Sequence, residues 1–147
     1  MQNMEGMPIW ANFRGLLFGP DGKLKDFREV HNTITNIGKY IAAEQVMPVP
    51  SYVDKPNWLA IGEGTPSGTL LGSEIARVVL DSKIRLLNVV TMVCTIPAGV
   101  GTGALTEAGI FDVVTPNTVN MWMSASFGVL NKGALDPFIA TWTLTFG

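Results

Sequence analysis

Residues 138–146, Phe138-Ile139-Ala140-Thr141-Trp142-Thr143-Leu144-Thr145-Phe146, form the most regular alternation in the chain. Aromatic residues, Ala and Leu take the even positions, while one Ile and three threonines take the odd ones. Because successive side chains of a β-strand point to opposite faces, this period of two predicts a strand with one face in a core. The stretch therefore favours a fold built from β-sheets.

Further strands are predicted at spacings near ten residues, each bounded by Gly, Pro, Asn or Asp. They cover residues 9–18, 23–30, 57–61, 78–80, 84–96, 109–114 and 119–127. Gly19-Pro20-Asp21-Gly22 predicts a tight turn, which makes the first two strands a hairpin with a bulge. A turn at residues 81–83 and loops at residues 97–103 and 128–137 separate the later strands.

The run of residues 84–96 is apolar at both parities, which predicts a strand covered on both faces. With this run included, seven or eight strands and one helix predict a mainly β fold. We expect an antiparallel β-sandwich or a jelly-roll-like domain.

One helix is predicted at about residues 33–47, where isoleucines at positions 34, 37 and 41 share a stripe. Asn32 or Thr33 is expected to cap its N-terminus, and Pro48 to end it. Gly38 inside the helix predicts close approach to another backbone.

The chain has 147 residues, the size of one domain. We expect residues 1–8, which are polar, to form an N-terminal arm, and residues 9–147 to form a single β-sandwich domain. The net charge is −2 and there is no run of Lys or Arg, which argues against binding to nucleic acid. Neither a secretion signal nor an apolar run long enough to span a membrane is present in the sequence, so we expect synthesis in a cytoplasm and no membrane partner.

Charged residues are unevenly distributed along the chain. Residues 1–85 contain eighteen of the twenty-two charged residues, and the remaining sixty-two residues contain four. Two explanations stay open at this point. Part of the C-terminal half is covered by other copies or by a partner, as in obligate interfaces, or the inner faces of both sheets are encoded late in the chain.

Glu107 and Asp112 are two of those four charged residues, within Gly103-Ala104-Leu105-Thr106-Glu107-Ala108-Gly109-Ile110-Phe111-Asp112. We interpret residues 103–109 as a loop that enters a strand. A buried carboxylate needs a partner, so we expect Glu107 to pair with Arg77 or with a backbone amide. Glu74, Arg77 and Glu107 are thus a candidate structural polar cluster; the alternative is that Glu74 and Arg77 are two solvated surface charges.

Five aromatic residues are candidate core or interface anchors. They are Trp10, Trp58, Trp122, Trp142 and Phe111. His31 is the only histidine and is expected to be a structural hydrogen-bonding residue. Cys94 is the only cysteine and is expected to be a buried, unreactive thiol. No catalytic, cofactor-binding or metal-ligating pattern is present, so we expect no enzyme activity and no cofactor.

Several segments occur together in an order that resembles the small virion structural proteins of tailed bacteriophages. They include His31-Asn32-Thr33-Ile34-Thr35-Asn36-Ile37-Gly38, Ala60-Ile61-Gly62-Glu63-Gly64, Leu71-Gly72-Ser73-Glu74-Ile75-Ala76-Arg77, the Glu107 stretch, and Asn131-Lys132-Gly133 with the last strand. The resemblance covers about residues 30–146. It departs from the usual pattern at Glu63, where that group has threonine.

The resemblance implies an all-β, non-enzymatic protein located in the virion. Its first implication is a capsid decoration or cement protein, a homo-oligomer such as a trimer, that bridges capsomers by binding the major capsid protein or other virion proteins. A tail, neck or fibre-base adaptor is the alternative. A third hypothesis, from a different class, is a carbohydrate-binding β-sandwich that uses Trp58 or Trp122.

Overall fold

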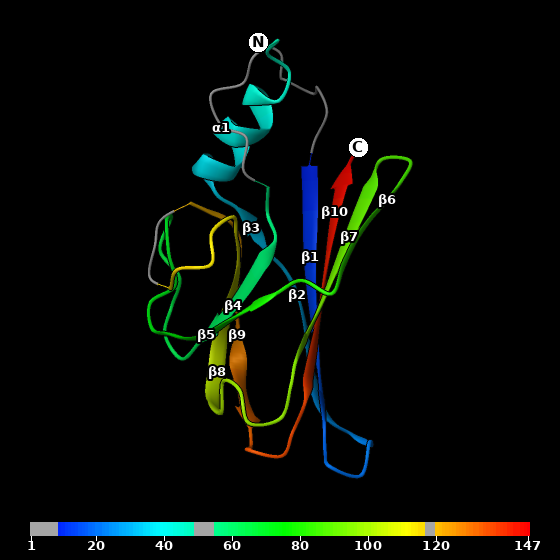
Figure 1. Cartoon of the computed structure of the whole chain (residues 1–147), viewed down its shortest axis with the longest axis vertical. Helices are drawn as coiled ribbons and strands as arrows, with labels where there is room; N and C mark the ends of the chain where they lie inside the picture. The colour runs from blue at the N-terminus through cyan, green and yellow to red at the C-terminus, as the bar shows by residue number, and fades with distance from the viewer. Residues whose placement is uncertain (1–8, 49–54, 117–119) are drawn as a thin grey trace.

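The computed structural model describes residues 9–48, 55–116 and 120–147, so the expected arm at residues 1–8 lies outside the described residues. Within these described ranges, ten strands form two five-stranded antiparallel sheets that face each other, with one short helix, α1 (Asn36–Glu44), at one end (Figure 1). Sheet A has the order β2-β1-β10-β7-β6 and sheet B has the order β3-β9-β8-β4-β5. The predicted mainly β fold, an antiparallel β-sandwich with one helix, is confirmed.

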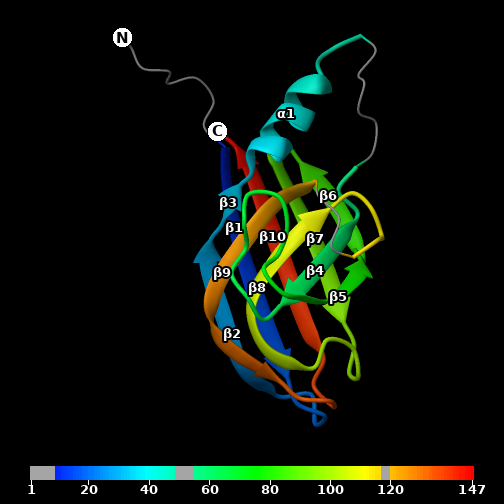
Figure 2. The same cartoon turned by 90° about the vertical axis from the view of Figure 1, so that its left-hand side faces the viewer.

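The strands have the following bounds. Sheet A contains β1 (Ile9–Phe18), β2 (Leu24–His31), β6 (Ser82–Leu86), β7 (Val89–Ile96) and β10 (Phe138–Phe146). Sheet B contains β3 (Thr33–Ile34), β4 (Trp58–Gly62), β5 (Glu74–Val79), β8 (Gly103–Phe111) and β9 (Met121–Lys132). Figure 2 shows the strands of sheet B crossing in front of those of sheet A.

The alternating stretch at residues 138–146 is β10, the central strand of sheet A, paired with β1 and β7. Its even positions point into the core, where Phe138, Ala140 and Trp142 are fully buried. The Trp142 ring contacts Phe13 edge-on at 4.8 Å, and Phe13 stacks on Phe127 of sheet B at 5.3 Å. These rings join the two sheets across the core.

The expected single strand at residues 84–96 is wrong. The chain forms two strands, β6 and β7, and the turn expected at residues 81–83 lies instead at Leu87 and Asn88, between the paired Leu86 and Val89. Leu87 adopts a positive φ of 54°, which an L-residue rarely does. The apolar run concealed this turn because Leu87 is not a typical turn residue.

The helix is shorter than expected and begins later. Thr33 and Ile34 pair with β9 as β3, so neither Asn32 nor Thr33 caps α1. Thr35 is the N-cap, and its hydroxyl oxygen accepts a hydrogen bond from the Gly38 amide at 2.9 Å. A Cβ on Gly38 would collide with the carbonyl oxygen of Trp122, which confirms the predicted close approach.

Two expected loops belong largely to strands. Residues 103–109 lie in β8, so the interpretation of this stretch as a loop entering a strand is wrong. β9 continues through residues 128–132, which were expected to be a loop, because a register shift opposite residues 105–107 of β8 accommodates Gly128. Glycine-rich sequence predicted a loop in both places, but pairing with neighbouring strands overrides that local preference.

Candidate interaction surface

The outer face of sheet B is covered by the chain itself. Residues 63–73, which connect β4 and β5, cross in front of β8 and β9 (Figure 2). Leu71 of this loop packs on Ala60, Phe111 and Met121 of sheet B in a second, smaller apolar cluster, against which Trp58 packs. We call residues 63–73 the covering loop.

Glu107 holds the covering loop in place. It lies on the outer face of β8, is 0% exposed, and accepts three hydrogen bonds from backbone amides. Its Oε2 accepts from Gly64 and Ser73 at 2.8 Å each, and its Oε1 accepts from Gly72 at 2.8 Å. Hydrogen bonds to an ionised carboxylate are roughly twice as strong as neutral ones. Of the two partners expected for Glu107, the structure gives backbone amides.

The loop reaches this carboxylate because Gly62 at the end of β4 and the glycines of the loop itself permit close approach of the backbones. A Cβ on Gly62 would collide with the Ser73 carbonyl oxygen, and a Cβ on Gly72 would collide with that of Thr65. The glycine-rich sequence therefore serves a tight carboxylate-binding loop.

Arg77 and Glu74 form a buried pair on the same outer face, beside Glu107 but bonded to each other. Two parallel hydrogen bonds of 2.8 Å join the guanidinium to the Glu74 carboxylate, and both side chains are 1% exposed. Arg77 also donates to the carbonyl oxygens of Val113 and Thr115, at 2.9 and 2.8 Å. Its Cζ lies 3.7 Å from the centroid of the Phe111 ring. These contacts contradict the alternative of two solvated surface charges.

The five aromatic anchors occupy different environments. Trp142 and Phe111 are fully buried, one in each apolar cluster. Trp58 and Trp122 are partly buried, and the Trp122 indole donates to Asp112 Oδ2 at 2.9 Å. Trp10 is 52% exposed and lies on the outer side of sheet A. Trp58 and Trp122 thus contribute to packing, and it is Trp10 that presents its ring to solvent.

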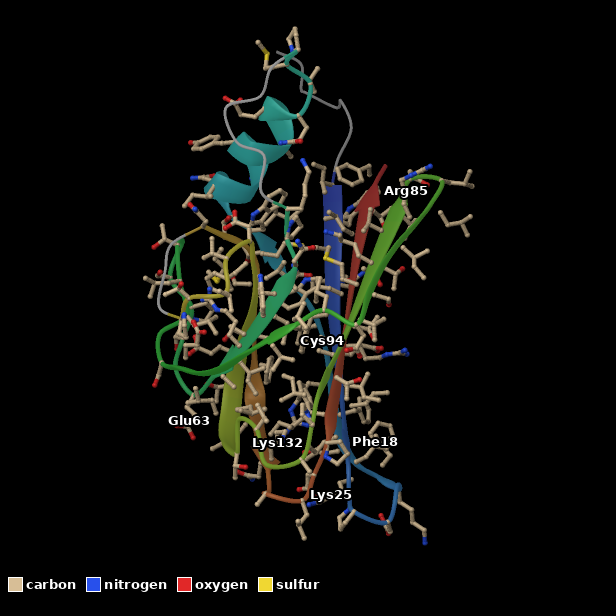
Figure 3. The ribbon with its side chains drawn as sticks, in the orientation of Figure 1. Phe18, Lys25, Glu63, Arg85, Cys94 and Lys132 are labelled. Atoms are coloured by element: carbon tan, nitrogen blue, oxygen red, sulfur yellow. The ribbon has the colours of Figure 1, made fainter. Side chains whose placement is uncertain are left out.

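Cys94 is buried in the centre of the sandwich, between the sheets (Figure 3). Burial, with a smaller contribution from the charge of Asp81, raises the pKa of the Cys94 thiol to about 12. The thiol donates to the Val79 carbonyl oxygen at 3.4 Å. His31 lies exposed at the end of β2, opposite Asn12 of β1.

Sequence reasoning missed a polar junction at the end of the sandwich opposite α1, where Lys25 and Lys132 lie (Figure 3). Lys25 Nζ forms a 2.6 Å ion pair with Asp136, which also accepts from the Gly133 amide at 2.9 Å. These contacts lower the pKa of Asp136, the Lys25 hydrogen bond most of all. Lys132 is 2% exposed and donates to the Pro97 carbonyl oxygen, and burial lowers its pKa. The scarcity of charge around Lys132 and Asp136 was the available signal.

The outer face of sheet A is uncovered over strands β10, β7 and β6. The register places a set of uncharged side chains outward, and no described segment lies over them (Figure 1). We call this set the uncharged face: Ile139, Thr141, Thr143, Thr145, Val89, Thr91, Val93, Thr95, Ser82, Ile84 and Leu86. Its two β6 aliphatic residues are the most exposed, Ile84 at 64% and Leu86 at 73%.

Next to the uncharged face, β1 and β2 contribute polar side chains. Arg14 and Glu29 lie opposite each other in the ladder between these strands. They line a shallow depression of about 500 Å³ together with Asn12, His31, Thr141 and Thr143. Trp10 follows on the same side of β1, two residues before Asn12.

Within the described residues, no group of His, Cys, Asp or Glu is arranged to hold a metal ion. The one helix in that part of the chain is too short to cross a membrane. Comparison with protein-family models, with curated proteins and with solved structures finds no match to this chain.

Proposed function

We propose that the chain is a non-enzymatic virion structural protein, a capsid decoration or cement subunit that associates with copies of itself and docks on another virion protein. The virion setting rests on the ordered motifs of residues 30–146, described above. The association rests on one structural observation, the uncharged face of sheet A.

A face of this kind suits association for two physical reasons. Fully buried interface centres are depleted of charged residues, because a charge must lose its hydration when the partner arrives. Strands β10, β7 and β6 place no charged side chain on this face. The Asp81 carboxylate lies at its margin, where it accepts hydrogen bonds from the Thr95 amide and hydroxyl at 2.8 and 2.6 Å. Alternating threonines and aliphatic residues on a sheet also present a regular, rigid surface, which lowers the entropic cost of binding.

Sheet B offers no equivalent surface over β4, β8 and the start of β9, because the covering loop already occupies it. Of the two outer faces, that of sheet A is therefore the one available to a partner. A subunit that binds only the assembled lattice stabilises that lattice by mass action.

The oligomeric state of the purified full chain, measured by sedimentation velocity, tests the association. Thr91 lies at the centre of the uncharged face, opposite Thr143 on one side and Ile84 on the other. We expect the wild-type chain to sediment as an oligomer and Thr91→Lys to sediment as a monomer. Thr102→Lys, at an exposed position before β8, is the matched control and should leave the oligomer intact. A wild-type monomer at all concentrations would contradict self-association.

Particles test the virion role. Hundreds of copies per particle, quantified by mass spectrometry, are expected for a decoration protein, whereas a few copies would indicate a tail, neck or fibre-base adaptor. Particles that lack the chain should release their genome at a lower temperature than complete ones. Equal heat resistance would contradict a cement role, and absence of the chain from particles would contradict the virion setting.

A further inference from the structure

Strand β6 is an edge of sheet A that the described chain leaves unpaired on its outer side. It pairs with β7 through residues 82–86 and leads into a hairpin tip at Leu87, which is 79% exposed. An edge strand presents backbone N–H and C=O groups that can pair with another strand. Figure 3 shows Arg85 at the far end of this hairpin, away from the sandwich.

The other edge strand of sheet A, β2, is held against sheet B by a charged side chain. Arg28 of β2 forms an ion pair with Asp26 at 2.7 Å, and its Nε donates to the Gly128 carbonyl oxygen of β9 at 2.9 Å. A further bond joins Arg28 to the Val129 carbonyl oxygen. These contacts join β2 to β9 of sheet B. Both edge strands carry exposed apolar side chains, Leu24 and Phe27 on β2 and Ile84 and Leu86 on β6.

The two sides of β6 differ in chemistry. Ile84 and Leu86 point to the outer face of sheet A, and Lys83 and Arg85 point to the opposite face of the sheet. Within the described residues, neither cation has a carboxylate at ion-pair distance. Lys83 Nζ donates to two neutral oxygens, the Pro56 carbonyl and Asn57 Oδ1, at 2.9 Å each. Burial lowers the pKa of Lys83, and the positive charge of Lys55 lowers it further.

This pattern disfavours pairing of β6 with β6 of a second copy. In an antiparallel pair around a two-fold axis perpendicular to the sheet, residues on the same side face each other directly. Pairing centred on Ile84 sets Lys83 against Arg85, and pairing centred on Lys83 or on Arg85 sets that cation against itself. Pairing centred on Ser82 sets Lys83 against Asp81, but the Asp81 carboxylate is turned toward β7, where it accepts from the Thr95 amide and hydroxyl at 2.8 and 2.6 Å. Like charges directly opposite each other destabilise a pair of strands.

We propose that β6 accepts an extended strand from another protein, in which apolar and acidic side chains alternate. This inference rests on the proposed function, since it names the surface at which the chain docks on a different protein. Backbone pairing would extend sheet A by one strand. The apolar side chains of the incoming strand would lie beside Ile84 and Leu86, and its carboxylates beside Lys83 and Arg85.

Two synthetic peptides test the proposal against the isotopically labelled full chain: an acetylated peptide of alternating glutamate and valine, and its counterpart of alternating lysine and valine. We expect the glutamate peptide to shift the backbone amide resonances of β6 and to slow their hydrogen exchange. The lysine peptide should do neither at the same concentration. Binding of the glutamate peptide should weaken as salt is added, because exposed charges are screened.

The double variant Lys83→Glu with Arg85→Glu should reverse the preference, with about a tenfold or greater loss of affinity for the glutamate peptide. The control variant Lys23→Glu with Lys39→Glu changes the net charge equally at exposed positions outside β6 and should bind as the wild type does. Equal shifts with both peptides, or shifts confined to other strands, would overturn the proposal.

Loss of the wild-type oligomer in the Lys83→Glu and Arg85→Glu variant without peptide would also overturn it, since β6 would then be an interface between copies. The proposed function fails on different results, a monomeric chain or particles that lack it. Each failure can therefore be recognised separately.

Discussion

The outer faces of the two sheets are built in opposite ways. On sheet B, charged side chains are buried under the chain's own covering loop, where Glu107 accepts three backbone amides and Arg77 pairs with Glu74. On the outer face of sheet A, the outward positions of strands β10, β7 and β6 carry only uncharged side chains, and no described segment lies over them. The outer face of sheet B is covered by the chain itself, and no described segment covers that of sheet A over these strands.

The difference shows on which face of a sheet a charged side chain can stabilise the fold. A carboxylate on an outer face can bind loop amides and so attach a loop, at the cost of its own hydration. The same carboxylate on an open face would have to be desolvated when a partner arrived. The placement of core strands late in the chain accounts for part of the uneven distribution of charge, because most of the main core cluster lies in β7, β8, β9 and β10. The association proposed above would account for the lack of charge on the outer face of sheet A.

Replacement of Arg77 by Met should have the largest effect on stability. The change leaves the Glu74 carboxylate without its bidentate partner at 1% exposure and removes the contact with the Phe111 ring. Breaking a buried ion pair by removing one partner costs about 3–5 kcal/mol. Urea denaturation of the variant should show a free energy of unfolding lower by about that amount.

Arg85→Met on sheet A is the matched control for Arg77→Met. Arg85 is exposed on β6 and donates to the Leu87 carbonyl oxygen. Its replacement should change the free energy of unfolding by no more than about 0.5 kcal/mol. Equal effects of the two substitutions would contradict the contrast between a closed and an open face.

Glu107→Gln should come next in size. The amide nitrogen of glutamine cannot accept a hydrogen bond, so at least one of the amides of Gly64, Gly72 and Ser73 loses its acceptor. We expect the free energy of unfolding to fall by about 2–4 kcal/mol, since each hydrogen bond to a charged group contributes about 1.5–3 kcal/mol. Hydrogen exchange should also become faster in the covering loop.

Glu63→Gln is the control for Glu107→Gln. Glu63 is exposed and accepts one hydrogen bond, from the Ala104 amide at 3.0 Å, which the carbonyl oxygen of glutamine can also accept. Its variant should keep nearly the stability of the wild type. If the two variants are equally stable, Glu107 does not hold the loop.

The alternation of residues 138–146 was sufficient to predict a buried β-strand, because a period of two is independent of the strand's neighbours. The hairpin turn at Leu87 and Asn88 was missed, because Leu87 adopts a positive φ that leucine rarely takes. Asn88, a typical turn residue inside the apolar run, was the available signal. Residues 103–109 were misassigned for a related reason. Glycine favours loops locally, but here Gly109 lies in β8, where its lack of a side chain lets Leu71 and Met121 pack closely above it.

The site was predicted in part. That Glu107 needs a partner follows from burial energetics alone, and so does the alternative of backbone amides. The pairing of Arg77 with Glu74 was not assigned. Residues three apart in a regular strand point to opposite faces. The register shift between β4 and β5 puts these two side chains on the same face, and the sequence does not reveal that shift. That β6 is an unpaired edge of sheet A could not be predicted, because it depends on the order of strands in the sheet, and a local sequence pattern does not give that order.

Asp136, in the loop that joins β9 of sheet B to β10 of sheet A, should make the free energy of unfolding depend on pH. The pKa of Asp136 is lowered in the folded state. The ionised carboxylate therefore contributes to the free energy of unfolding above the ordinary pKa of a carboxyl, and this contribution is lost as pH falls through the lowered pKa. The stability difference between wild type and Asp136→Asn should therefore be constant above about pH 5 and shrink below about pH 4. Lys25→Met should weaken this dependence, because Lys25 is the main cause of the shift. A difference that is the same at all pH values would contradict the assignment.

The smallest effect is expected from a charge placed on the open face. Thr91→Lys introduces a cation at the centre of the uncharged face. On a monomeric chain this lysine stays hydrated, as in an ordinary surface substitution. The melting temperature should therefore change by about 1–2 °C at most. Ser124→Lys is the equivalent change on sheet B, opposite Gly109, where Ser124 is 6% exposed beneath other parts of the chain. There the cation must be buried, and the melting temperature should fall by several times that amount.

The comparison is made at a concentration at which both variants are monomeric, so that association does not contribute to the melting temperature. Equal changes at the two positions would mean that the outer face of sheet A is covered as closely as that of sheet B.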